Sequence, residues 1–358
     1  MSDYDYGNAR LHVMKSRLLP RSELEALAGT GTLQGLIAAM TKTVYQKSVE
    51  AALTRATGVQ CIDEALRYDL VSTIEKLRDF YVEDARETVT LSLRAYDIHN
   101  LKAILRGLSK NVPAGDILIV LLPIGELSMS TLRDLAQLNN PREAIDMLAS
   151  LGLSLAWPLL NVRAEVPGAE TFEMELALDQ WYHEKARQGL RSETGRVDPL
   201  SHALALEADL ANVLTVLRFA QYPQERDLLR DRLGTDEIEV LFIGPGRIPY
   251  ELLLNACRQD SVTAAVDILS GTFLEPALRA GLEAYSRSKR LSDIERRLRR
   301  YRLEWMAEQI TKDPLGIGMV LGYVALKTNE VGNIRWIAQG INLGLKVDAI
   351  RAELEIVS

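Results

Sequence analysis

The stretch YDIHNLKAILRG, from Tyr96 to Gly107, decides the fold because its pattern occurs twice more in the chain. An acid, two residues, an asparagine and an aliphatic residue recur in the same order in ADLANVLTVLRF (208–219) and in NEVGNIRWIAQG (329–340). The acids and asparagines of the three copies are Asp97 and Asn100, Asp209 and Asn212, and Glu330 and Asn333. A short match of this kind arises easily by chance, so further landmarks are needed.

Two further landmarks precede each copy in the same order. IDEAL (62–66), MELAL (174–178) and IERRL (294–298) share an apolar residue, and each ends in a leucine that stands 34, 34 or 35 residues before the asparagine. Farther upstream lie Leu24 with Leu27, Leu132 with Leu135, and Leu253 with Ala256. Three landmarks in one order predict a threefold repeat of about 110 to 120 residues. We expect homologous domains at 1–112, 113–232 and 233–358, the last carrying a C-terminal tail.

The apolar spacing inside each repeat is helical. In the third repeat a 3,4,3,4 spacing lines one face of an α-helix, formed by Leu291, Ile294, Leu298, Tyr301 and Trp305. Gly and Pro punctuate LLPIGELS (121–128) and FIGPGRIP (242–249). We interpret the apolar runs ILIVLL and EVLFI before them as helix ends, although short strands also fit. The segment ERDLLRDRLGTDEIE (225–239) is expected to be an inserted surface helix or loop. The sequence predicts an all-α fold.

The repeated asparagines are predicted to be structural. Asparagine is unfavourable inside a helix because its amide competes for backbone groups. A side chain that returns three times has a fixed task, such as satisfying a loop or capping a helix. We therefore expect Asn100, Asn212 and Asn333 to be buried and bonded to backbone. His99 has no counterpart in the other copies, so we interpret it as incidental and not as a ligand.

The composition excludes several classes of protein. The 358 residues are 47% hydrophobic and 25% charged, which is typical of a soluble globular protein. The net charge of -7 argues against a dedicated nucleic-acid binder. Cys61 and Cys257 lack the spacing of a metal or redox pair, so we expect two buried free thiols. No apolar run approaches the roughly 20 residues of a membrane helix, and the N-terminus lacks a signal-peptide core. A soluble, cytoplasmic chain is expected.

A search for catalytic motifs finds none. The chain has no P-loop and no GxSxG elbow, and HEKAR at His183 places Arg187 where a second zinc ligand would stand. The sequence therefore predicts no catalytic residue, no metal site and no cofactor. An enzyme with a site between the repeats stays open as an alternative, for which His183 and His202 are the only suggestive residues.

One basic segment stands out near the C-terminal third. Residues 287–302 contain only two acids, Asp293 and Glu295, but eight cations: Arg287, Lys289, Arg290, Arg296, Arg297, Arg299, Arg300 and Arg302. A basic face of this kind docks on an acidic partner with electrostatic steering. The competing interpretation is a solvated helix face balanced by carboxylates elsewhere. A nucleic-acid binder using this face would show strongly salt-dependent affinity.

Four motifs together resemble a known family. They are YGNARLHVMKSRLL (6–19), YDIHNLKAILRG (96–107), EADLANVLTVLRF (207–219) and DPLGIGMVLGYVALKTNEVGNIR (313–335). Over residues 4 to 350 the chain resembles the C subunit of archaeal and bacterial A/V-type ATPases, which is the counterpart of the d subunit in eukaryotic vacuolar ATPases. It departs at Leu214, where the other repeats have Lys102 and Arg335, and at Gln339, where they have Arg106 and Arg218.

The resemblance implies a fold and a function. The fold would be three homologous helical domains about a pseudo-threefold axis, forming a funnel. The function would be that of a non-catalytic central-stalk rotor subunit, a socket between the axle of the D and F subunits and the membrane proteolipid ring. It would serve proton or sodium transport and ATP synthesis or hydrolysis, with no nucleic acid involved. One copy per complex would lie on the cytoplasmic side, touching the membrane only through the ring. The basic segment is a candidate for either contact. The alternative is an all-α repeat scaffold or adaptor unrelated to rotary ATPases.

Overall fold

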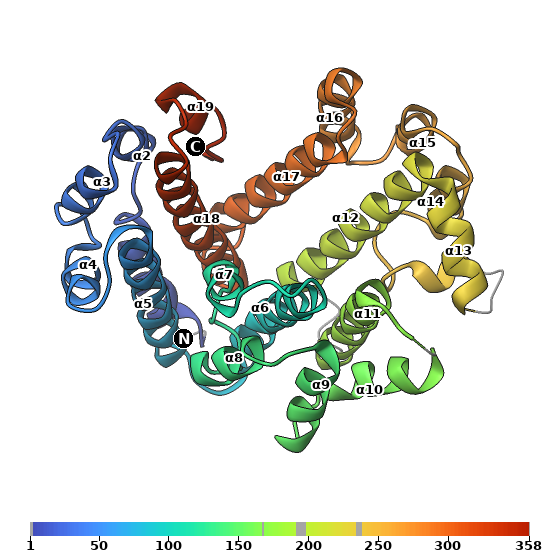
Figure 1. Cartoon of the computed structure of the whole chain (residues 1–358), viewed down its shortest axis with the longest axis horizontal. Helices are drawn as coiled ribbons and strands as arrows, with labels where there is room; N and C mark the ends of the chain where they lie inside the picture. The colour runs from blue at the N-terminus through green and yellow to red at the C-terminus, as the bar shows by residue number, and fades with distance from the viewer. Residues whose placement is uncertain (1–2, 167, 191–197, 234–237, 358) are drawn as a thin grey trace. The chain divides into compact units, whose positions relative to one another are not determined.

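The computed structural model describes residues 3–166, 168–190, 198–233 and 238–357. Within these ranges all regular secondary structure is helical, which confirms the all-α prediction (Figure 1). In the described residues α1 (Asp5–Lys15) comes first and is followed by three sets of six α-helices.

The helices of each set follow one order: three short helices, two long ones and a final short one. The first set is α2 (Arg21–Ala28), α3 (Leu33–Met40), α4 (Gln46–Leu53), α5 (Gly58–Asp79), α6 (Glu83–Ser109) and α7 (Ala114–Val120). The second is α8 (Met129–Ala136), α9 (Pro141–Ser150), α10 (Ala156–Glu165), α11 (Thr171–Gly189), α12 (Pro199–Gln221) and α13 (Pro223–Leu233). The third is α14 (Tyr250–Cys257), α15 (Val262–Leu269), α16 (Glu275–Ser288), α17 (Leu291–Lys312), α18 (Ile317–Asn342) and α19 (Val347–Ala352), preceded by the short 3-10 helix η1 (Ile238–Leu241).

The sequence landmarks fall on equivalent helices of the three sets. The leucine pairs lie on α2, α8 and α14, and the repeated asparagines lie on α6, α12 and α18. Helix capping repeats as well: Thr32, Asn140 and Ser261 precede the second helix of each set and accept an N–H bond three residues ahead, at 3.0, 3.0 and 3.2 Å. The division into three domains at residues 112 and 232 stays a prediction.

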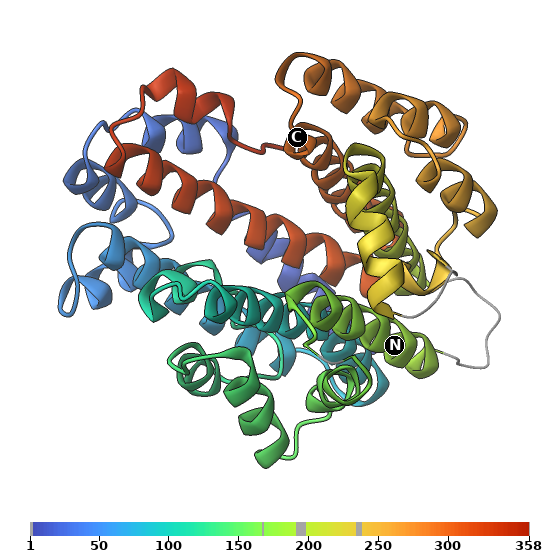
Figure 2. The same cartoon turned by 45° about the vertical axis from the view of Figure 1, so that its right-hand side comes forward.

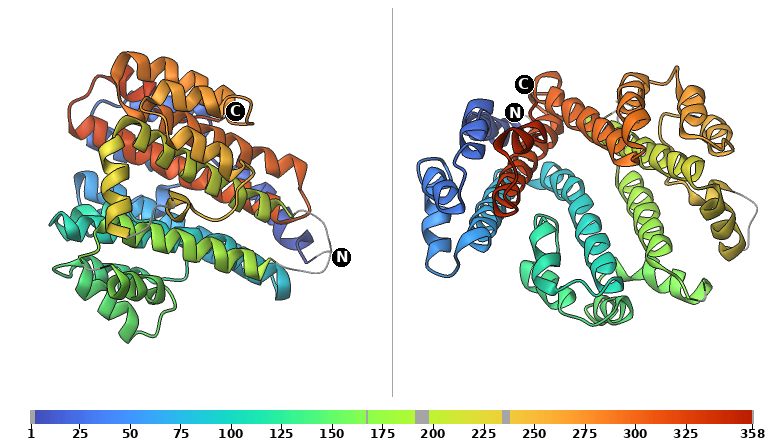
Figure 3. Two further views of the ribbon diagram at one scale, coloured as in Figure 1. Left: turned by 90° about the vertical axis from the view of Figure 1, so that its right-hand side faces the viewer. Right: turned by 45° about the horizontal axis from the view of Figure 1, so that its top comes forward.

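By contacts, the described chain forms two compact units. Unit 1 comprises Met1–Asn100, Leu118–Leu132 and Met306–Ser358, and unit 2 comprises Leu101–Ile117 and Arg133–Trp305. In unit 1, α18 packs against α1, α2, α3 and α5 (Figures 1 and 2). In unit 2, α12 packs against α14 and α15 (Figure 3). The second long helix of one set therefore packs on the first two helices of another set. Helix α12 packs on α14 and α15 of the third set, and α18 packs on α2 and α3 of the first.

The apolar face predicted on α17 lies in the core of unit 2. Ile294 and Leu298 belong to its buried cluster, and Leu291, Tyr301 and Trp305 pack against that cluster. The helical interpretation of this spacing is confirmed.

The two apolar runs before the Gly/Pro segments contain no strand in their described part. Helix α7 ends at Val120, inside ILIVLL, and η1 occupies the start of the run around EVLFI. The segment 225–239 falls largely on α13, which takes the place of α7 and α19 in its set and is longer than both. The segment expected to be an inserted surface helix or loop is therefore largely an extended sixth helix; residues 234–237 lie outside the described residues.

Candidate functional site

An acid and an amide on α6 hold the loop that follows α7. Asn100 Nδ2 donates to the Leu122 carbonyl at 2.8 Å, and Asn100 Oδ1 accepts from the Leu122 N–H at 2.8 Å. One turn earlier, Asp97 accepts the backbone N–H bonds of Glu126 at 2.7 Å and of Leu127 at 3.0 Å. Asp97 is 1% and Asn100 0% exposed, so these bonds satisfy groups that water does not reach.

We call this arrangement, an acid and an asparagine on one helix that bind the backbone of a following loop, a clasp. The same clasp occurs on α12. Asn212 exchanges both bonds with the backbone of Ile243, at 3.0 and 2.8 Å. Asp209 accepts from the N–H groups of Arg247 at 2.8 Å and Ile248 at 3.0 Å. The asparagine and its partner are 22 residues apart in the first clasp and 31 in the second, because α13 and the segment after it lengthen the second interval.

The third asparagine makes the same pair of bonds with the C-terminal segment. Asn333 Nδ2 donates to the Glu355 carbonyl at 2.9 Å, and its Oδ1 accepts from the Glu355 N–H at 2.9 Å. Asn333 is 5% exposed. The prediction that all three asparagines are buried and bonded to backbone is confirmed.

The third acid binds the beginning of the chain. Glu330 Oε2 accepts the backbone N–H of Leu19, which immediately precedes the cap of α2. Leu127 precedes α8 and Ile248 precedes α14 in the same way, and these are the N–H groups bound by the first two acids. Each acid therefore holds the backbone at the entrance of the next set's first helix, and the last acid holds that of the first set.

Two glycines make the first two clasps possible. A Cβ atom on Gly125 would overlap the carboxylate of Asp97, and one on Gly246 would overlap that of Asp209. Only glycine lets the backbone N–H groups that follow come this close to the carboxylate. This explains Gly125 of LLPIGELS and Gly246 of FIGPGRIP.

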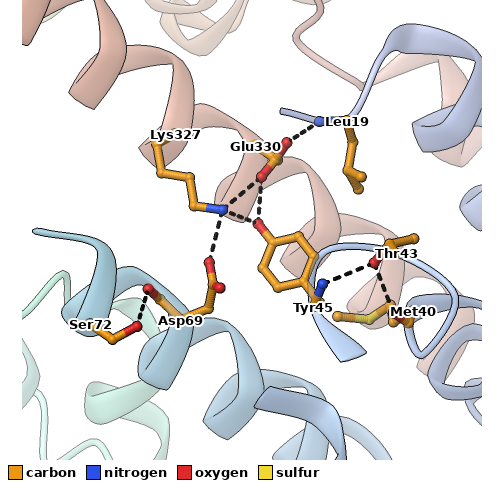
Figure 4. A network of polar contacts seen from close by, with 8 residues as sticks. All are labelled: Leu19, Met40, Thr43, Tyr45, Asp69, Ser72, Lys327 and Glu330. Carbon is orange, nitrogen blue, oxygen red and sulfur yellow. Dashed lines mark hydrogen bonds and ion pairs between the residues drawn. The ribbon is translucent and has the colours of Figure 1, made fainter. Parts of the chain in front are cut away.

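A buried lysine network surrounds the third acid (Figure 4). Lys327 Nζ lies 2.9 Å from Glu330 Oε1 and 2.8 Å from Asp69 Oδ2, and it donates to the Tyr45 hydroxyl oxygen at 2.9 Å. The Tyr45 hydroxyl in turn donates to Glu330 Oε1 at 2.6 Å. The side chains of Lys327 and Glu330 are 5% and 4% exposed. The buried ammonium thus has two hydrogen bonds and a second carboxylate beside it, as a buried charge requires.

Sequence reasoning missed Lys327, Tyr45 and Asp69. Each occurs in one repeat only, so the search for repeated positions passed over them. The available signal was Lys327 three residues before Glu330 in a helix that is otherwise mostly apolar, a spacing that places the two side chains on one helix face.

Burial shifts the pKa values of the clasp acids. Burial raises the pKa of Asp97 to about 6, while the N–H bonds from Glu126 and Leu127 pull it in the opposite direction. Burial also raises the pKa of Asp209. The pKa of Tyr45 is raised well above its ordinary value, first by burial and then by the charge of Glu330, so the hydroxyl keeps the proton that it donates to that carboxylate.

The position that differs between the repeats also differs in its contacts. Lys102 on α6 pairs with Asp179 on α11 at 2.5 Å, and Arg335 on α18 pairs with Asp63 on α5 at 3.4 Å. Leu214, at the equivalent place on α12, packs against the apolar cluster of unit 2. Helix α12 thus makes an apolar contact at this position, whereas α6 and α18 each form an ion pair with a helix of the next set.

Two further family motifs meet in unit 1. Asn8 Nδ2 donates to the carbonyls of Pro314 and Gly316, both at 3.0 Å, and Asn8 Oδ1 accepts from the Tyr81 hydroxyl at 2.7 Å. A Cβ atom on Gly7 would overlap the ring of Tyr81. The YGN sequence of α1 therefore fixes the DPLG turn that starts α18.

The basic segment is mostly exposed, with Arg296 and Arg302 half-buried, and it is partly neutralised. Arg287 lies in the last turn of α16, and the residues from Arg296 onward lie on α17. Four of its arginines pair with carboxylates: Arg287 with Glu283, Arg299 with Glu295, Arg300 with Glu304 and Arg302 with Glu207. Exposed ion pairs of this kind contribute little stability. A role of this face in partner binding stays a prediction.

The remaining candidates do not form a site. His99 is exposed, with Nε2 3.4 Å from the Val120 carbonyl; His202 is exposed, and burial lowers the pKa of His183. Cys61 and Cys257 are buried free thiols, as expected. In the described ranges no three His, Cys, Asp or Glu side chains could share a metal ion. No helix of those ranges is both long and apolar enough to cross a membrane.

The contacts described above define a helical scaffold with no recognisable catalytic site among the described residues. Comparison with known proteins shows which protein family it belongs to. Residues 7–353 match the family model of the ATP synthase (C/AC39) subunit. The chain is 27% identical to the C subunit of the A-type ATP synthase of Methanosarcina acetivorans, covering 99% of this chain and 94% of the relative. It is 26% identical to the C subunit of the V-type ATP synthase of Deinococcus radiodurans, covering 99% and 91%.

The chain belongs to the family of ATP synthase C/AC39 subunits. The members of this family are structural stalk subunits of ATP synthases and not catalytic subunits. The family expected from the sequence motifs is confirmed.

Proposed function

We propose that the chain is the rotor socket of a rotary A/V-type ATPase. It couples the axle of the D and F subunits to the membrane proteolipid ring, and so to the transport of protons or sodium ions. One copy per complex lies on the cytoplasmic side as a peripheral protein that touches the membrane only through the ring. Its three homologous domains form a funnel about a pseudo-threefold axis. The observation that carries the proposal is the family match over residues 7–353.

A torque coupler needs a body that does not yield, and the clasps support this requirement. Helices α6, α12 and α18 are each bonded to the backbone at the entrance of the next set through a buried carboxylate, and to a neighbouring segment through a buried amide. Hydrogen bonds that involve charged groups in a dry interior are stronger than neutral ones. Close packing around them transmits strain instead of absorbing it.

The exposed part of the basic segment is our candidate for a partner contact. Lys289, Arg290 and Arg297 are exposed and form no ion pair with a carboxylate among the described residues. Cations in this position attract an acidic partner and speed its association. Arg290→Glu with Arg297→Glu should weaken binding to the axle or the ring and remove part of its salt dependence.

The test presents the purified chain separately to purified D–F complex and to detergent-solubilised proteolipid ring, with native mass spectrometry as the readout. We expect one copy of the chain on each. Lys110→Glu with Arg142→Glu, which reverses two exposed cations elsewhere, serves as the matched control for the charge variant. Binding to neither partner, with the helical circular-dichroism spectrum intact, would reject the socket and favour the unrelated scaffold.

A further inference from the structure

A pocket of about 880 Å³ opens in unit 1 beside the lysine network. It is bounded by α1 and the turn after it, by α4, by α5 and by α18. Its size falls within the roughly 300 to 1,000 Å³ of small-molecule sites in proteins. None of the clasp acids and asparagines lines it.

The pocket is strongly basic, although the protein carries a net charge of -7. One carboxylate lines it, Asp69, and this group already pairs with Lys327 at 2.8 Å. The other lining cations are exposed and form no ion pair with a carboxylate among the described residues; they are Arg10, Arg17, Lys47 and Lys76. A cleft lined by uncompensated charge of one sign concentrates counter-ions of the other.

The same pocket has an apolar side. Val13, Met14 and Leu18 line it from α1 and the following turn, and Val44 and Phe80 line it from the first set. Val13 is 53% and Val44 47% exposed. Exposed apolar groups beside these cations suit a ligand that joins an anionic group to an apolar body.

We propose that this pocket binds an amphipathic anion with a phosphate head group and an acyl body, that is, an anionic phospholipid. The phosphate lies among the four exposed cations, of which Arg10 and Arg17 offer planar donors suited to phosphate oxygens. The acyl body lies against Val13, Met14 and Val44. Lys327 also lines the pocket, but it already contacts Asp69, Glu330 and Tyr45, so it adds positive charge without donating to the ligand.

The test titrates the full chain with three probes by isothermal titration calorimetry. The probes are dihexanoyl phosphatidylglycerol below its micelle concentration, dihexanoyl phosphatidylcholine with the same acyl chains, and inorganic phosphate. We expect saturable binding of the phosphatidylglycerol, with phosphatidylcholine and phosphate at least about tenfold weaker. Phosphate binding as tightly as the lipid would overturn the acyl part of the proposal and identify free phosphate as the source of the anion.

Two variants locate the site. Lys47→Gln with Lys76→Gln removes two exposed cations and should weaken phosphatidylglycerol binding about tenfold. Ala51→Trp, at an exposed position that lines the pocket, should block it without changing its charge. Lys110→Gln with Arg142→Gln removes two exposed cations outside the pocket and should have no effect. Absence of saturable binding, or equal affinity in all four proteins, would overturn the proposal.

Discussion

Each clasp asparagine acts as an additional peptide group. Its amide offers one donor and one acceptor to a single residue, as a neighbouring strand would, although its own helix continues undisturbed. A shorter or apolar side chain cannot satisfy the facing N–H and C=O together. The residue type is therefore required by chemistry and not by helix propensity.

We expect Asn212→Leu to lower the free energy of unfolding by roughly 1 to 3 kcal/mol, because the N–H and C=O of Ile243 lose their partners while buried. Equilibrium urea unfolding measures the loss. Asn255→Leu, at an exposed position on α14, is the control. Equal stability of the two variants would contradict the structural role of the clasp.

Lys327→Met should destabilise the protein by about 3 to 5 kcal/mol, because it leaves Asp69 and Glu330 charged without their buried partner. Thermal and urea unfolding measure the effect, with exposed Lys42→Met as the control in the same unit. Adding Asp69→Asn and Glu330→Gln removes both charges and should restore part of the stability. No recovery in the triple variant would mean that packing, and not charge, dominates at this site.

Asp97 should give stability a pH dependence of unusual sign for a carboxylate. Its folded pKa of about 6 lies above the ordinary value of 3.8, so between these values the folded chain holds a proton that the unfolded chain releases. The contribution of Asp97 to stability therefore falls as the pH rises from about 4 to about 6. The stability difference between wild type and Asp97→Asn should shrink by about 2 kcal/mol between pH 4 and pH 7. A stability difference that stays constant between pH 4 and pH 7 would contradict the raised pKa of Asp97 in the folded chain.

At the scale of elements, α18 is an interior helix that keeps glycine for close packing at one place and not at another. At Gly322 a Cβ atom would lie 2.7 Å from the Met306 carbonyl oxygen and overlap Ile310, whereas at Gly332 it would meet no atom within 4 Å. Both positions are glycines on α18, so substituting each by alanine separates the effect of close packing on stability from the effect of helix propensity.

Gly332→Ala should raise the free energy of unfolding by about 0.5 to 1 kcal/mol through helix propensity alone. Gly322→Ala should lower it, because α18 must move away from α17. Differential scanning calorimetry of the pair measures both changes. Stabilisation by both substitutions would show that the α17–α18 contact is looser than described.

The helices could be predicted from sequence to the extent that they repeat. The spacing of Ile294 and Leu298 placed the buried face of α17, and three matching landmarks placed the equivalent helices of all sets. The partner of each clasp could not be predicted, because the interval from asparagine to partner changes from 22 to 31 residues. The lysine network was out of reach because Tyr45 and Lys327 are 282 residues apart and neither repeats.

At the scale of the whole molecule, the two ends of the chain complete the same unit. Asn8 on α1 binds the start of α18, and Glu330 on α18 binds the entrance of α2. The C-terminal segment adds the partner of Asn333, and Arg351 donates to the Glu25 carbonyl at 3.0 Å. Unit 1 thus depends on contacts between residues more than 300 positions apart.

Removal of residues 353–358 should destabilise unit 1 selectively, because Asn329 and Asn333 then lose the Glu355 backbone that both bind. Hydrogen exchange should speed up in α18 and α2 while α12, α14 and α15 keep their protection. The stability loss should be about 1 to 3 kcal/mol. Faster exchange throughout unit 2 would show that the described chain unfolds as one cooperative body instead.

The position of Glu330 far along the chain from Leu19 and Tyr45 has a consequence for how the chain folds as it is made. Helices α2, α3 and α5 are synthesised well over 200 residues before α18, yet they pack on it. Until residues 317–342 emerge, the Leu19 N–H and the Tyr45 hydroxyl lack their carboxylate. Unit 2 has no such delay, since its own clasp joins segments that are synthesised close together in time. The helices of the first set must therefore wait, with this surface uncovered, until α18 has been made.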